Sequence, residues 1–139
     1  MDEPRVEPLS DAEQRWIVKC VAAAMQWCNT DDLPSLEALE ALAVRRMAEP
    51  ENATASIDVV AVAIGEHLRR ASGLEWKVIT DDYGTAIGLY RAEGHIVVVP
   101  QSTVAKRWGA GEPFVVSLVT QMIDHLARIA REYSEAKAN

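Results

Sequence analysis

Three short apolar segments, separated by glycine-containing turns, constrain the fold of this 139-residue chain more than any other feature. They run from Leu74 to Thr80, from Thr85 to Arg91 and from His95 to Val99, and Pro100 ends the third. Short apolar segments bounded by Gly, Asp and Pro are typical of β-strands. The connections hold only three or four residues, so consecutive strands must reverse direction. The stretch therefore predicts a three-stranded antiparallel β-meander, and the continuously apolar third strand is expected to be central or best covered.

Helical periodicity marks the residues on both sides of the meander. Three helices are expected before it, starting near Ser10, Pro34 and Ser56, and two after it, over residues 101–108 and from Pro113 to about Tyr133. Ser or Pro at a helix start satisfies or removes backbone N–H groups that have no partner there. The third helix is apolar around most of its circumference, which predicts that it lies at the centre of the domain.

The order of these elements indicates an α+β fold. About five helices are expected to pack with the meander in the order α-α-α-β-β-β-α-α. We expect a single domain over residues 10–133, a flexible N-terminal tail at 1–9 and a frayed C-terminus at 134–139.

The last helix carries apolar residues at heptad spacing over nearly three repeats. These positions are Val115, Val119, Met122, Leu126, Ile129 and Tyr133. Such a seam fits a coiled coil, and a stripe that packs on the domain's own core has the same spacing at this length. The second interpretation is favoured. A homodimer through this helix or through an edge strand is the alternative.

Charge and composition restrict the partners. The formal net charge is −7, from 14 basic and 21 acidic residues. This balance argues against nucleic acid and against an anionic membrane surface, both of which bind basic patches. It leaves basic protein partners open.

A cytoplasmic location is predicted from three features. The N-terminus lacks the basic and apolar regions of a signal peptide, and no apolar run approaches the ~20 residues that span a bilayer. Cys20 and Cys28 lie eight residues apart in one expected helix, about 12 Å along its axis, which is too far for a disulfide. Two unpaired thiols fit a reducing compartment.

Histidine, cysteine and acidic residues give no strong catalytic pattern. His67, His95 and His125 stand in different elements without metal-ligand spacing, so no metal and no cofactor is expected.

Asp81 and Asp82 could be paired carboxylates for acid–base chemistry. Asp also favours turns because it bonds its own backbone, and Gly84 supplies a positive φ, so the turn interpretation is favoured. Glu75, near Lys77, fits a cross-strand pair, and a catalytic role would need a second positioned group.

A basic and aromatic cluster follows the strands. Lys106, Arg107 and Trp108 could bind an acidic partner, with the Trp ring as the anchor. The simpler interpretation is an amphipathic helical turn in which Val104 and Trp108, four residues apart, pack inward. Spacing favours this second interpretation.

The segment from the third helix onward resembles an uncharacterised, mainly bacterial family, the domain of unknown function numbered 3806. The similarity covers roughly residues 57–130. The matching pieces are Gly65–Leu68, the sequence Gly73-Leu74-Glu75-Trp76, the sequence Asp82-Tyr83-Gly84, the strand that ends at Pro100, Lys106-Arg107 and Gly111-Glu112. The family pattern has Asp-Glu-Tyr-Gly where this chain has Asp81-Asp82-Tyr83-Gly84. The resemblance implies a small α+β domain and transfers no catalytic residue.

Two functional hypotheses follow. The first is a non-catalytic protein-interaction module, such as an adaptor, an effector chaperone or an immunity-type inhibitor of another protein. The second is a small-molecule-binding or hydrolytic domain with a carboxylate pocket around Glu75 and Asp82. The candidate binding residues are Glu75, Trp76, Asp82, Tyr83, Lys106, Arg107 and Trp108. No catalytic residue is assigned, and an enzyme is the less favoured of the two classes.

Overall fold

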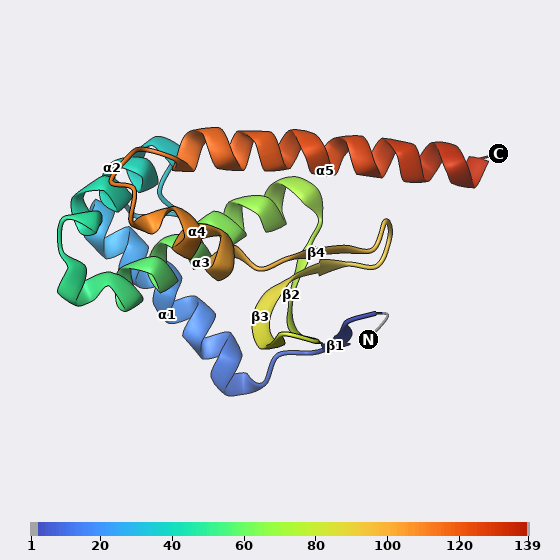
Figure 1. The fold of residues 1–139 in the computed structure, drawn as a ribbon, viewed down its shortest axis with the longest axis horizontal. Helices are drawn as coiled ribbons and strands as arrows, with labels where there is room; N and C mark the ends of the chain where they lie inside the picture. The colour runs from blue at the N-terminus through green and yellow to red at the C-terminus, as the bar shows by residue number, and fades with distance from the viewer. Residues whose placement is uncertain (1–2, 139) are drawn as a thin grey trace.

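The computed structural model describes residues 3–138 and has an α+β architecture. Most helices gather at one side of the molecule, the strands lie at the other, and the last helix runs along both (Figure 1). The elements, in chain order, are β1 (Arg5–Glu7), α1 (Asp11–Cys28), α2 (Leu36–Met47), a 3₁₀ helix (Pro50–Asn52), α3 (Ala53–Ser72), β2 (Glu75–Asp81), β3 (Gly84–Arg91), β4 (Ile96–Val98), α4 (Pro100–Trp108) and α5 (Val115–Ala138). The predicted fold class and the three predicted strands are confirmed, and a fourth strand is added.

The predicted capping chemistry is confirmed at the first helix. Ser10 and Glu13 form a complete capping box: the Glu13 amide donates to Ser10 Oγ at 3.1 Å, and the Ser10 amide donates to Glu13 Oε1 at 2.7 Å.

The second helix is capped by Ser35 and not started by Pro34, which precedes the cap: the Ser35 hydroxyl accepts from the amide of Ala38. The third helix begins at Ala53 and not near Ser56; it has no side-chain cap, and Ser56 lies buried within it. The start of α5 is capped from another helix. Glu40 of α2 accepts the amide of Val116 at 3.1 Å, where a carboxylate also complements the helix dipole.

The third helix lies at the centre of the molecule, as predicted. α3 contacts α1, α2, α4 and α5, and its residues from Val59 to Gly65 are buried without interruption. It ends at Gly73, whose φ of 67° favours glycine. The last carbonyl of the helix, on Ser72, accepts a hydrogen bond from Arg91 Nη1 at 2.8 Å. A side chain of β3 therefore provides a hydrogen-bond donor for a carbonyl at the C-terminal end of α3.

The sheet is antiparallel throughout, in the order β1-β2-β3-β4. The β2–β3 ladder closes on the pair Asp81 and Gly84, so the hairpin loop consists of two residues, Asp82 and Tyr83. The order corrects one prediction. The strand around Ile96–Val98 is an edge strand and not the central one. Ile96 is buried and Val98 is partly buried in the main core, whereas Val97 is exposed.

Alternation along the strands gives the sheet two different faces. Trp76, Leu89 and Val98 pair in one row and join the hydrophobic core, and we call theirs the inner face. The neighbouring row of Glu75, Tyr90 and Val97 points to the opposite side, which we call the outer face. The strand residues in the two hydrophobic clusters belong to the inner face, so the helices pack on that side.

The N-terminal segment differs from the prediction. Residues 5–7, expected in a flexible tail, form β1, which pairs with β2 in the register Arg5–Thr80, Val6–Ile79 and Glu7–Val78. The sheet thus has four strands and not three. Three residues between two prolines are too few to show an alternating pattern. Backbone pairing holds β1 in place and side-chain burial contributes little, so its sequence gives almost no strand signal. The predicted tail also includes residues 1 and 2, and the predicted frayed C-terminus includes residue 139. These three positions lie outside the described residues.

The last helix is longer than predicted and uses its seam within the chain. α5 continues to Ala138, five residues beyond the expected end at Tyr133. It runs along α2 and α3, and its C-terminal turns extend past the other helices (Figure 1). Val115, Val119 and Leu126 are buried in this contact. The favoured interpretation of the heptad spacing, packing on the domain's own core, is therefore confirmed.

Candidate functional site

Two pieces of the proposed family pattern meet where α3 faces β2. A Cβ atom on Gly65 would lie 2.3 Å from Trp76 Cη2 and 2.5 Å from Cζ2, so the indole ring occupies the space that a side chain would need. The group that approaches α3 at Gly65 is therefore an aromatic ring and not another backbone. Glycine at this buried helical position is thus explained by packing against Trp76.

The same contact has a polar component. Trp76 Nε1 donates to Glu66 Oε1 at 3.3 Å, and Arg69 Nε donates to Glu66 Oε2 at 2.8 Å. The Glu66 side chain is only 12% exposed, so the two donors compensate for its partial desolvation. Trp76, a candidate binding residue, therefore has a structural role: its ring packs against α3 and its N–H bonds Glu66. The role of Glu66 was not apparent from sequence, because no periodic signal links it to a strand ten residues away.

Glu75 and Asp82 do not converge. Glu75 begins β2, and Asp82 lies in the loop after its last residue, so a strand of roughly 23 Å separates them at 3.3 Å per residue. Glu75 instead lies beside Lys77, with 3.7 Å between the carboxylate and Nζ. A carboxylate pocket that uses both Glu75 and Asp82 is not formed.

The β2–β3 hairpin presents a fully exposed aromatic residue. Tyr83 is 99% exposed. Its amide donates to Asp81 Oδ1 at 2.8 Å, and Gly84 follows with a φ of 135° that other residues rarely adopt. The turn interpretation of this acidic corner is thus confirmed for Asp81. The same turn holds the Tyr83 backbone in place while its ring extends into solvent.

The basic and aromatic cluster of α4 is an amphipathic turn. Val104 and Trp108 are buried, at 0% and 7% exposure. Lys106 and Arg107 are exposed in the last turn, where cations are favourable, and Arg107 Nη1 donates to the carbonyl of Thr103. Trp108 is therefore a core residue and cannot anchor a partner.

A hollow of about 510 Å³ lies on the outer face of the sheet. Its lining includes Val6 of β1, Glu75 and Lys77 of β2, and Tyr90 of β3. Tyr90 also lines a second hollow of about 290 Å³, together with Glu3, Pro4, His95 and Val97. The N-terminal segment thus borders both hollows on this face.

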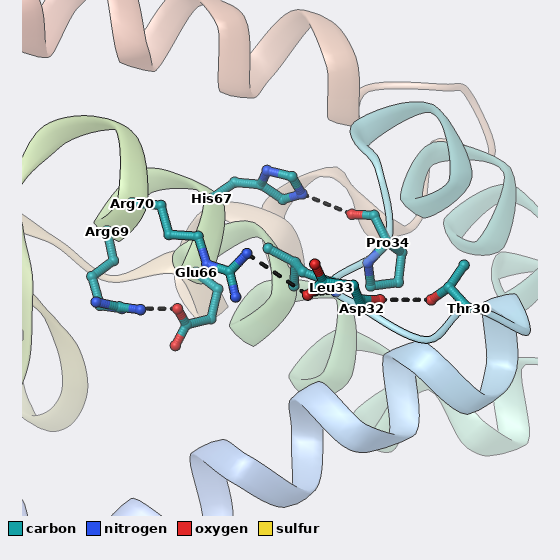
Figure 2. Close-up of polar contacts among 8 residues, drawn as sticks. All are labelled: Thr30, Asp32, Leu33, Pro34, Glu66, His67, Arg69 and Arg70. Carbon is teal, nitrogen blue, oxygen red and sulfur yellow. Dashed lines mark hydrogen bonds and ion pairs between the residues drawn. The ribbon is translucent and has the colours of Figure 1, made fainter.

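Polar contacts fix the loop between α1 and α2 to α3, as Figure 2 shows. His67 Nε2 lies 2.8 Å from the carbonyl oxygen of Pro34 and serves as the donor, since the carbonyl can only accept. Arg70 lies 4.0 Å from Asp32, an exposed pair that contributes little stability. Thr30 Oγ1 donates to the Asp32 carbonyl at 2.7 Å. His67 is therefore a structural residue that holds this loop.

A model of the domain of unknown function DUF3806 matches residues 35–119, which is more than half of the chain. The chain belongs to the DUF3806 family. The match starts at the cap of α2 and ends in the second turn of α5. Searches of curated proteins and of solved structures found no match.

The DUF3806 match covers the middle of the chain. Strands β2, β3 and β4 and helices α2, α3 and α4 lie within it, whereas β1 and α1 precede it. Within the matched part, Gly65, Gly73, Trp76 and Trp108 have structural roles. Tyr83 is the aromatic residue of the DUF3806 match that the fold leaves entirely in solvent.

Among the residues that the structure describes, three titratable groups of this DUF3806 protein have shifted pKa values. Burial raises the pKa of the Cys20 thiol to about 11, and the nearby charge of Asp58 adds to the effect. Burial also raises the pKa of Cys28, partly offset by Arg45. The pKa of Asp58 is raised by burial and lowered in part by its hydrogen bond from Gln101. Both thiols therefore stay protonated and unreactive at neutral pH.

Among residues 3–138, no group of three or more His, Cys, Asp and Glu side chains could hold a metal ion. No helix there is long and apolar enough to cross a membrane.

Proposed function

We propose that this DUF3806 protein is a non-catalytic protein-interaction module that contacts its partner through the tip of the β2–β3 hairpin. The observation that carries the proposal is the 99% exposure of Tyr83 on a turn that is fixed by Asp81 and Gly84. Tyrosine is enriched among the residues that dominate binding energy at interfaces. A single aromatic side chain on a fixed backbone loses little conformational entropy when it enters a pocket.

The charge of the molecule indicates the chemistry of the partner. The net charge is −7, and Asp81 and Asp82 directly precede Tyr83. An acidic tip favours a partner whose pocket is apolar and bordered by Lys or Arg. Adaptor, effector chaperone and immunity-type inhibitor all fit such a contact. A cytoplasmic location, inferred from the two unpaired cysteines, belongs to the same proposal.

A small-molecule-binding function is the second candidate, and the outer hollow of about 510 Å³ favours it. Its volume falls within the usual range for ligand sites. Glu75 and Lys77 would supply its polar contacts, but Asp82 lies at the far end of β2 and cannot contribute. Saturable NMR shifts of the Glu75, Lys77 and Tyr90 amides with a metabolite mixture, abolished by Lys77→Ala, would favour this candidate over the first.

The test is a quantitative pull-down from host lysate with the full chain as bait. Tyr83→Ala should reduce recovery of any stoichiometric partner at least tenfold, whereas Val18→Ala, which removes a side chain 66% exposed on α1, should leave recovery unchanged. Tyr83→Phe should retain most of the binding. Equal recovery with wild type and Tyr83→Ala would reject the tip as the contact. Recovery of no stoichiometric protein would reject the interaction function.

A further inference from the structure

The edge of β2 is covered by a strand that makes few side-chain contacts with it. β1 has three residues, of which only Val6 is partly buried. Arg5 and Glu7 are exposed and pair with each other at 2.9 Å. Backbone pairing with Val78, Ile79 and Thr80 is thus the main attachment of β1.

Register shows which backbone groups make this attachment. Pairs that exchange hydrogen bonds alternate along an antiparallel ladder, and a two-residue loop closes on such a pair, here Asp81 and Gly84. Residues Ile79 and Asp81 therefore direct their N–H and C=O groups to β3. Val78 and Thr80 direct theirs to the opposite side, toward β1.

The β2 edge offers more length than β1 uses. β2 spans seven residues, and β1 pairs with three of them. Along Glu75–Lys77, no strand of the described residues pairs on that side. The outer hollow lies beside this uncovered stretch, since Glu75 and Lys77 line it together with Val6. A longer strand could continue from the position of β1 along the hollow.

The residues matched by the family model do not include β1. β2 to β4 lie within the matched residues 35–119, and β1 precedes them at residues 5–7. In the matched part alone, β2 is an edge strand. β1 also protects its own free edge, because Pro4 and Pro8 flank it and Arg5 and Glu7 are charged. A second strand would therefore replace β1 more readily than add to it.

We propose that the β2 edge is a docking site for an extended strand of a partner protein, and that residues 5–7 are its intramolecular occupant. The occupant already present defines the chemistry: an extended segment with an apolar residue beside Ile79 and polar residues on either side. The docking edge at Val78–Thr80 adjoins the tip that carries Tyr83, so one partner can contact both. The proposal deepens the proposed interaction function and rests on it, with strand addition supplying backbone hydrogen bonds and Tyr83 the anchor.

The experiment uses the full chain and a synthetic peptide with the sequence of residues 3–10. Arg5→Pro combined with Glu7→Pro removes both N–H groups of β1 that face β2. The matched control, Arg5→Ala with Glu7→Ala, keeps them. In ¹⁵N spectra, the peptide should shift the amides of residues 75–80 of the proline variant saturably below 1 mM and bind the alanine control at least tenfold more weakly. A peptide that carries the same two prolines should not bind.

Three outcomes would overturn the proposal. One is a folded proline variant whose β2 amides ignore the peptide. A second is slow hydrogen exchange in the native chain: if the Val78 and Thr80 amides exchange as slowly as those of Val60 and Ile64 in the core, β1 opens only on global unfolding. This measurement does not need the proline variant to fold. Concentration-dependent dimers of the native chain would assign the edge to a second copy. Tyr83→Ala reports separately on the tip, so the two proposals can fail independently.

Discussion

Replacing Gly65 by alanine tests the contact between α3 and the sheet. A methyl group there would lie 2.3 Å and 2.5 Å from two atoms of the Trp76 ring and 3.3 Å from Pro100 Cγ. The ring must move. It is held by its hydrogen bond to Glu66 and by packing in both hydrophobic clusters.

Opposing effects set the size of the change. Overpacking in a core costs about 1–3 kcal/mol, and weakening the hydrogen bond to Glu66 adds about 1 kcal/mol. Alanine recovers about 1 kcal/mol of helix propensity relative to glycine. The free energy of unfolding should therefore fall by about 1–3 kcal/mol in Gly65→Ala, which corresponds to a drop in Tm of roughly 4–12 °C for a chain of this size.

Urea unfolding followed by far-UV circular dichroism measures this change without relying on tryptophan fluorescence. The control is the same substitution in a Trp76→Leu background, where the two clashing ring atoms are absent. There, Gly65→Ala should be neutral or stabilise by up to about 1 kcal/mol. If Gly65→Ala stabilises the wild-type background as well, or if the two substitutions are additive, the ring does not require glycine at this position.

Three further predictions concern the core, a half-buried carboxyl group and the thiols. Trp108→Ala should lower the free energy of unfolding by about 3–5 kcal/mol, whereas Lys106→Ala should change it by less than about 0.5 kcal/mol; equal effects in urea titrations would contradict the burial of the ring. Because the pKa of Asp58 is raised in the folded state, stability should fall as pH rises from the usual value of 3.8 through the folded pKa, and Asp58→Asn should flatten that part of a pH-dependent unfolding series. With a thiol reagent at pH 8, half-buried Cys28 should react before buried Cys20, whose raised pKa leaves little thiolate; the reverse order of labelling in mass spectra would show that the α1 core opens first.

The sequence predicted the central part of the fold well, because its signals are local. The turn at Asp81–Gly84 between two short apolar segments identified the β2–β3 hairpin, which the structure contains. The spacing of Val104 and Trp108 predicted correctly that the ring points inward. These features depend on neighbouring residues, which a sequence displays directly.

Signals that depend on distant partners were missed. β1 exists because β2 offers a free edge, and nothing in residues 5–7 themselves indicates a strand. Trp76 and Glu66 meet only because α3 folds back on the strand that follows it. The separation of Glu75 and Asp82, in contrast, could have been inferred, since seven residues of strand place them at opposite ends.

The position of α5 at the end of the described chain has a consequence for synthesis. Its apolar seam covers α2 and α3, and its first turn is capped by Glu40 from a helix made much earlier. As the chain is translated from its N-terminus, these surfaces stay in water until α5 has been made. A premature stop before Val115 would leave them exposed permanently, and such a product should partition into the insoluble fraction of an expressing cell, while a stop after Tyr133 should leave it soluble.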